Sequence, residues 1–167
     1  QGIRNANDGL STLQIKDGAL NNISTLLDRL ATLATQAASG ETSDASRATL
    51  DQEFQDVLAE ITRESTVAGL QTDTGFSVFV SNNGANGKIT GTIAGASVDS
   101  LGLTGASLQT QADAEAAVAT VANAVKLLGQ AQSTIGVLQN RLQFAIGLAQ
   151  SQVVNNKAAE SRIRDAN

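Results

Sequence analysis

The last third of this 167-residue chain, from about Gln111 to Arg164, repeats apolar residues at steps of three and four with no proline between them. The residues in this series are Val118, Val121, Val125, Leu128, Ala131, Ile135, Leu138, Leu142, Ala145 and Ala149. The spacing is that of one helix face, and at about 1.5 Å per residue such a helix is roughly 80 Å long. Because this length exceeds the diameter of a compact domain of this size, the pattern predicts an elongated molecule.

A second helical pattern occupies residues 1–38. Its large aliphatic residues again lie at steps of three, four and seven: Leu10, Leu13, Leu20, Ile23, Leu27, Leu30 and Leu33. Gly9 and Gly18 each cost a helix about 1 kcal/mol relative to alanine, so we expect this helix to be stabilised by packing against neighbours.

The pattern stops at residues 39–44, which are rich in turn formers. Gly40 is placed for a left-handed cap at the end of the first helix, and Ser43 or Asp44 can cap the start of a second. The second helix is predicted over residues 45–68 and should fold back on the first. Its expected inward residues are Leu50, Phe54, Val57, Leu58 and Ile61, and its expected polar face carries Asp51, Glu53, Asp56, Glu60 and Arg63.

Between the second and last helices, residues 72–110 have a different pattern. Apolar and polar residues alternate over 76–81 and again over 88–93, on either side of an Asn- and Gly-rich stretch, which predicts a β-hairpin. A Gly-, Ser- and Thr-rich connector follows over 94–112, and Val98, Leu101 and Leu103 are its expected anchors against a helix. The segments together predict one mainly α domain over residues 1–167, a rod of three long antiparallel, coiled-coil-like helices with one β-hairpin.

The composition removes several classes of chemistry. The chain has no His and no Cys, so it cannot form a Cys–His or Ser–His–Asp catalytic site, and it lacks the preferred ligands of zinc. The net charge is −5, which does not favour binding to nucleic acid or to an anionic membrane. No uninterrupted apolar run reaches about 18 residues, so we expect no membrane-spanning segment. Both ends break off within helical patterns and are expected to continue in a longer chain.

Three motifs that could carry chemistry fail on inspection. A phosphate-binding loop around Gly84–Gly91 would need Gly in place of Asn82 and Ser or Thr in place of Ile89. A calcium loop with Gly9 as its central glycine would place the cation Arg4 at its first ligand position. The carboxylates Asp44, Asp51, Glu53, Asp56 and Glu60 are interpreted as a solvated helix face rather than a catalytic pair. We therefore predict no catalytic, cofactor or metal site, and no enzyme.

Short motifs near both ends point to a family. The stretch Ile3-Arg4-Asn5-Ala6-Asn7-Asp8-Gly9-Leu10, followed by Asp17-Gly18-Ala19-Leu20, closely resembles the N-terminal conserved segment of bacterial flagellins. Near the other end, Leu138-Gln139-Asn140-Arg141-Leu142 and Glu160-Ser161-Arg162-Ile163-Arg164-Asp165-Ala166 resemble the C-terminal segment of that family. The resemblance covers essentially the whole chain and implies the family's rod-shaped D1 domain, without the terminal D0 helices and with little or no outer variable region.

The resemblance implies a structural role. Flagellins are secreted through the flagellar export channel, and their copies assemble by helix-to-helix contacts into the extracellular filament that drives motility. The implied partners are other flagellin subunits, an export chaperone and the filament cap, with no cofactor, nucleic acid or membrane. Without the terminal helices, the chain alone is expected to remain a soluble monomer. A hook–filament junction or adaptor protein of the flagellum is the alternative, although such a protein would not be expected to carry both terminal motifs.

The same family is recognised by the flagellin-sensing Toll-like receptor of innate immunity. Its contact motif, an Arg and a Leu four residues apart followed by Gln-Ala, matches Arg29, Leu33, Gln36 and Ala37, and an ungapped alignment places the family's contact Glu at Glu53. The resemblance thus implies a receptor-binding site at Arg29, Leu33 and Glu53. The neighbouring Arg and Glu of the family are replaced here by Ala31 and Thr32.

Overall fold

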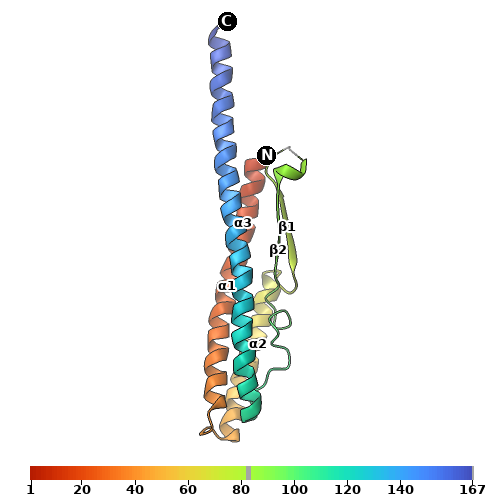
Figure 1. Cartoon of the computed structure of the whole chain (residues 1–167), viewed down its shortest axis with the longest axis vertical. Coiled ribbons are helices and arrows are strands. Elements are labelled where there is room, and N and C mark those ends of the chain that lie inside the picture. Colours follow the sequence, from red (N-terminus) through yellow and green to blue (C-terminus); the bar gives the residue numbers. More distant parts are fainter. Residues whose placement is uncertain (82–83, 167) are drawn as a thin grey trace.

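The chain forms a slender rod of three helices with one small sheet, as seen in a computed structural model that describes residues 1–81 and 84–166 (Figure 1). The elements, in order, are α1 (Gly2–Ala38), α2 (Asp44–Val67), β1 (Thr74–Phe79), the short 3₁₀ helix η1 (Gly84–Gly87), β2 (Lys88–Ile93) and α3 (Gln111–Ala166). Helix α1 runs antiparallel to both α2 and α3. The predicted fold class, a mainly helical rod with one hairpin, is confirmed.

Helices α1 and α3 form the long axis of the rod through a heptad-spaced seam. The buried residues of α3 alternate strictly in steps of three and four: Ala114, Ala117, Val121, Ala124, Leu128, Ala131, Ile135, Leu138 and Leu142. The buried residues of α1 include a matching series: Ala6, Gly9, Leu13, Leu20, Ile23, Leu27, Leu30, Ala34 and Ala37. This pattern is the signature of a coiled coil. Beside the seam, Gln132 of α3 donates a hydrogen bond to the Asn21 side chain of α1 at 3.3 Å.

The predicted seam of α3 was wrong at two positions. Val118 and Val125 are 36% and 44% exposed, while Ala117 and Ala124 are buried. Alanine at these contact positions lets the helix backbones come close together, which turns the larger valines to the flank. At both positions the more hydrophobic residue of the neighbouring pair was predicted to face the seam, whereas the smaller alanine does.

Helix α2 packs on α1 through a shorter apolar face. Phe54, Leu58 and Ile61 are buried, as predicted, whereas Leu50 and Val57 are only half-buried. Asp51 lies at 7% exposure, so its assignment to the solvated polar face of this helix was wrong. The carboxylate is buried because it accepts hydrogen bonds from the connector that follows the hairpin, a long-range contact that helical periodicity does not reveal.

The turn between α1 and α2 does not use the predicted left-handed glycine. Positive φ angles among the described residues occur at Gly69, Gly84, Gly102 and Gly105, and not at Gly40. The last carbonyl groups of α1 are instead satisfied by side chains, because the Thr42 hydroxyl donates to the Gln36 carbonyl at 2.8 Å and Arg47 donates to others. Ser43 caps α2 as expected, accepting a hydrogen bond from the Ser46 amide at 3.1 Å.

The β-hairpin lies against the α1–α3 pair, with β1 in contact with α1 and β2 in contact with α3 (Figure 1). Strands β1 and β2 pair antiparallel, with Phe76 opposite Gly91 and Val78 opposite Ile89. Two glycines permit the close approach: a Cβ on Gly9 would lie 2.8 Å from the Val78 side chain, and one on Gly91 would lie 3.0 Å from the Leu138 side chain. Residues 82–83 of the predicted hairpin turn lie outside the described residues.

The connector after the hairpin is anchored by aliphatic side chains. Leu101, Leu103 and Leu108 are fully buried, and Val98 is half-buried against the same core. This agrees with the expected anchoring by Val98, Leu101 and Leu103, to which the structure adds Leu108. The connector therefore belongs to the core of the rod rather than to a separate unit.

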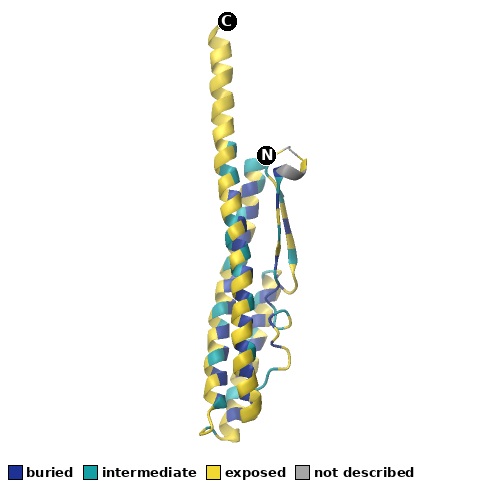
Figure 2. Cartoon of the chain, in the orientation of Figure 1, coloured by how far each residue is buried: buried dark blue, intermediate teal, exposed yellow. Residues whose placement is uncertain are grey.

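Helix α3 extends well past the other elements. Leu142 is its last buried residue, and every described position from Gln150 onward is exposed (Figure 2). After Leu142, several large apolar side chains of α3 are exposed: Phe144, Leu148, Val153, Val154 and Ile163. Among the described residues, no helix is long and apolar enough to cross a membrane.

Candidate functional site

Arg29 and Glu53 meet on the surface where α2 lies against α1. The Arg29 Nε atom donates to Glu53 Oε1 at 2.8 Å, and Nη2 of the same guanidinium contacts the same oxygen. Both side chains are about half exposed, at 49% and 46%. Two of the three residues assigned to the receptor-binding site, separated by 24 positions in sequence, therefore form one ionic surface feature.

Leu33, the third residue of that site, is placed differently. It follows Arg29 by one helical turn, but its side chain has 0% exposure and belongs to the central core. A fully buried side chain offers no surface to a partner. Leu33 is therefore a core residue of α1, and the exposed polar part of this predicted site is the Arg29–Glu53 ion pair.

Arg47, which the sequence argument did not single out, ties the start of α2 to the end of α1. The residue is only 5% exposed. Its guanidinium donates to the Ala37 carbonyl at 2.7 Å, to the Ser39 carbonyl at 2.8 Å and to Asp44 Oδ1 at 2.8 Å. A cation here also interacts favourably with the negative end of the α1 dipole. In the sequence, Arg47 is simply an arginine one turn after a helix N-cap. Exposed arginines also occur at that position, so the sequence does not indicate that Arg47 is buried.

Asp51 lies one turn further along α2 and holds the connector. Its Oδ1 atom accepts from the Leu108 amide at 2.9 Å and from Gln55 Nε2 at 3.1 Å, and Oδ2 accepts from Gln109 Nε2 at 3.3 Å. The Gln55 amide also donates to the Ala106 carbonyl at 2.9 Å. This small network fixes the connector against the first half of α2.

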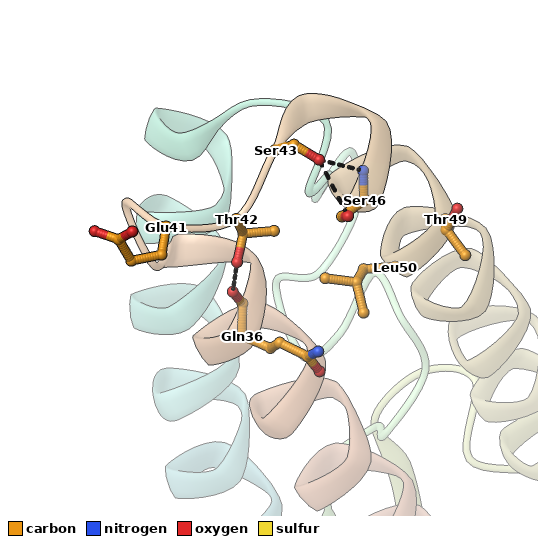
Figure 3. Close-up of a pocket in the computed structure, with 7 residues that line it drawn as sticks. All are labelled: Gln36, Glu41, Thr42, Ser43, Ser46, Thr49 and Leu50. Atoms are coloured by element: carbon orange, nitrogen blue, oxygen red, sulfur yellow. Dashed lines mark hydrogen bonds between the residues drawn. The ribbon is translucent and has the colours of Figure 1, made fainter.

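A shallow cavity of about 480 Å³ lies beside the α1–α2 turn (Figure 3). Hydroxyl side chains dominate its lining, which comprises Gln36, Glu41, Thr42, Ser43, Ser46, Thr49 and Leu50. The hydroxyl groups of Thr42, Ser43 and Ser46 are already engaged in local hydrogen bonds, which Figure 3 shows as dashed lines. The cavity is thus the polar outer side of the capping turn and presents no convergent reactive groups.

Glu60, Arg63 and Glu64 of α2 form surface ion pairs. Arg63 donates through Nε to Glu60 Oε2 at 3.1 Å, and this hydrogen bond lowers the pKa of Glu60 and raises the pKa of Arg63. Within residues 1–81 and 84–166, no three His, Cys, Asp or Glu side chains gather in a way that could hold a metal ion.

Comparison with known proteins identifies the family. Residues 1–69 match the family described as the bacterial flagellin N-terminal helical region. Over 99% of its length the chain is 29% identical to flagellin from Halalkalibacterium halodurans, and over 80% of its length it is 36% identical to flagellin from Escherichia coli K12. The crystal structure of Bacillus cereus flagellin superposes with a TM-score of 0.73 at 28% identity, covering 94% of each chain. The chain belongs to the bacterial flagellin family.

Two features of this flagellin-family chain follow from the comparisons. It spans 64% of the H. halodurans protein and 65% of the Treponema maltophilum flagellar filament 31.3 kDa core protein, to which it is 28% identical, so it matches only part of these relatives. Family membership also supports the prediction that the chain is not an enzyme, since flagellins are structural filament proteins.

Proposed function

We propose that this chain is a structural subunit of the bacterial flagellar filament and that residues 1–167 form one D1-type domain. The observation that carries the proposal is the match to B. cereus flagellin, which spans 94% of both chains and includes the long α1–α3 pair. An elongated rod with exposed helix faces is suited to side-by-side packing of many copies. A contact between identical subunits that does not close into a ring generates an open helical filament.

The proposal includes the partners and location of a filament protein. Other copies of the same chain are the main partner, and an export chaperone and the filament cap assist secretion and assembly. The mature protein then lies outside the cell in the flagellum. The names of the Treponema relatives, flagellar filament core proteins, support this assignment over a junction or adaptor protein.

Quantitative mass spectrometry of flagella sheared from the source bacterium tests the filament role. Peptides of this chain should be among the most abundant and should exceed those of hook–filament junction proteins, because a filament contains far more subunits than a junction. Deletion of the gene should remove the filament but leave the hook. Peptides at the level of junction proteins, or intact filaments after deletion, would support the adaptor alternative.

We also propose that the Arg29–Glu53 surface is recognised by the flagellin-sensing Toll-like receptor. The supporting observation is that the fold joins these two residues in one half-exposed ion pair. Arginine is enriched among the residues that carry most of the binding energy at protein interfaces. Leu33, one helical turn after Arg29, belongs to the buried core of the same helix.

A cell reporter assay with purified variants tests the receptor role. Arg29→Ala and Glu53→Ala should each weaken signalling. Arg63→Ala is the matched control, because Arg63 is an exposed α2 arginine that pairs with Glu60 and Glu64 of its own helix. Leu33→Ala should weaken signalling together with stability, since truncating a buried leucine costs about 2–5 kcal/mol. Unchanged signalling by Arg29→Ala and Glu53→Ala would refute the site.

A further inference from the structure

In the first half of α2 the most deeply buried side chains are polar, and the apolar Leu50 is only half-buried against the core. Over residues 44–53 the buried residues are Arg47 and Asp51, and the first buried apolar side chain of the helix is Phe54. In contrast, α1 and α3 bury aliphatic or small residues at nearly every heptad position. Two buried charged residues therefore help to hold the segment that presents Glu53.

These two residues attach the segment to different parts of the rod. Arg47 joins it to the C-terminal carbonyl groups of α1, and Asp51 joins it to the connector at the Leu108 amide. Fork-shaped guanidinium contacts and charge-assisted hydrogen bonds are directional, so together they define both the position and the rotation of the helix. Glu53 lies two residues after Asp51 and one before Phe54, at the boundary between the polar attachment and the apolar core.

We propose that Arg47 and Asp51 are positioning residues that place Glu53 opposite Arg29 and thereby determine recognition of this surface by a protein receptor. Neither residue is itself offered to a partner, since they are 5% and 7% exposed. Their effect on recognition passes through the Arg29–Glu53 ion pair. The recognition part rests on the proposed receptor function, whereas the positioning part concerns the free chain alone.

The positioning part is tested by NMR on the free chain. In the wild-type chain the Arg29 Nε–H group donates to Glu53, so its resonance should be protected from exchange with water. Arg47→Met should remove this protection while the chain stays helical by circular dichroism. Arg63→Met, the matched control, should leave it unchanged because Arg63 forms its ion pairs with Glu60 and Glu64 of its own helix.

Asp51→Asn serves as a second variant of similar shape, should Arg47→Met lose its folded structure. It keeps one carbonyl acceptor but loses the charge and the second acceptor, so we expect partial loss of protection. Retained protection of Arg29 Nε–H in a folded Arg47→Met or Asp51→Asn chain would overturn the positioning role. This conclusion holds whether or not the receptor binds the chain.

The recognition part is tested by binding of the purified receptor ectodomain. Arg47→Met should weaken binding roughly tenfold, corresponding to the loss of one charge-assisted contact. In the Arg47→Met background, adding Arg29→Ala should have a smaller effect than it has in the wild type, because the ion pair is already displaced. A general loss of stability would instead leave the two effects additive, and additivity would overturn the proposal.

A separate comparison distinguishes failure of this inference from failure of the receptor function. If the wild-type chain and Arg29→Ala bind the receptor equally, or neither binds, the receptor function is wrong and recognition through the ion pair is wrong with it. The NMR result would then still decide whether Arg47 and Asp51 position Glu53. If Arg29→Ala weakens binding but Arg47→Met does not, the receptor function stands and the positioning of its surface by Arg47 is refuted.

Discussion

Helix α1 contacts two other helices, and its contacts with α3 and with α2 are built from different residues. Against α3 it presents a regular series of aliphatic and small side chains along most of its length. Against α2 it combines a short apolar face with polar contacts at both ends, from Arg47 at one end and Lys16 at the other. Lys16 interrupts the aliphatic series of α1 and donates to the Ala68 carbonyl at 2.8 Å, where α2 ends.

The difference shows that stability and the placement of α2 depend on different kinds of contact. Apolar burial stabilises without strong direction, so a repeated seam gives the rod its length and most of its stability. Hydrogen bonds to charged groups add less net free energy but set geometry, so a few of them fix where α2 lies. Perturbing the seam should therefore change global stability, whereas perturbing the polar ends of α2 should change local order.

The largest effect is expected in the seam. Ile135→Ala removes a fully buried side chain of α3 and should lower the free energy of unfolding by about 2–5 kcal/mol. Val137→Ala, two residues away on the exposed face, should change it by no more than about 0.5 kcal/mol. Urea unfolding followed by far-UV circular dichroism measures both, because the chain has no Trp or Tyr for fluorescence. Equal losses would show that this face of α3 is not the core face.

An intermediate and local effect is expected at Asp51. Asp51→Ala leaves the buried Leu108 amide without its acceptor and should cost about 1–3 kcal/mol. Hydrogen exchange should accelerate at Leu108 and its neighbours more than in α3. Asp56→Ala, at an exposed position of the same helix, is the control and should leave these amides protected. Uniformly faster exchange along the whole rod would contradict the local role.

A smaller effect, of opposite sign, is expected at Gly18 of α1. A Cβ at this position meets no atom within 4 Å, so Gly18→Ala should raise the free energy of unfolding by about 0.5–1 kcal/mol through helix propensity alone. Gly2→Ala provides the contrast, because its Cβ would lie 2.2 Å from the Val80 carbonyl oxygen and should displace the hairpin. Thermal unfolding measures both, and destabilisation by Gly18→Ala would indicate a close neighbour that the fold does not show.

The smallest effect is expected from the exposed Glu60–Arg63 pair. Arg63 lowers the pKa of Glu60, so the ionised carboxylate favours the folded state. This contribution is present above the ordinary pKa of 4.5 and is lost as the pH falls through the lowered folded value. Arg63→Met should slightly flatten the dependence of urea midpoints on pH in that acidic range. A change as large as that of Ile135→Ala would mean that the pair is not merely a surface contact.

The sequence predicted the elements of the fold because their patterns are local. Steps of three and four identify the helices, and alternation around a Gly- and Asn-rich turn identifies the hairpin. Side-chain size misled the assignment of α3, where Ala117 and Ala124 rather than Val118 and Val125 form the contact. Which residue faces the seam depends on the distance between the two helices, and the sequence of one helix does not reveal that distance.

The candidate surface was predictable only through family resemblance. Arg29 and Glu53 are ordinary charged residues, and their pairing arises from the return of α2 along α1. The burial of Leu33 and the polar attachments of Arg47 and Asp51 depend on tertiary contacts. A buried charged residue on a helix has the same local sequence as an exposed one, so periodicity assigned Asp51 to solvent.

Cross-linking of α1 to α3 tests the central claim most directly. The chain has no cysteine, so Asn21→Cys and Gln132→Cys introduce a unique pair at positions whose side chains are hydrogen-bonded at 3.3 Å. A short bismaleimide reagent should link this pair within one molecule. Asn21→Cys with Val154→Cys should remain unlinked, because Val154 follows Gln132 in the same helix by a distance of roughly 33 Å at about 1.5 Å per residue. Failure of the first pair to cross-link, or equal cross-linking of both, would contradict a rod in which these two helices lie side by side.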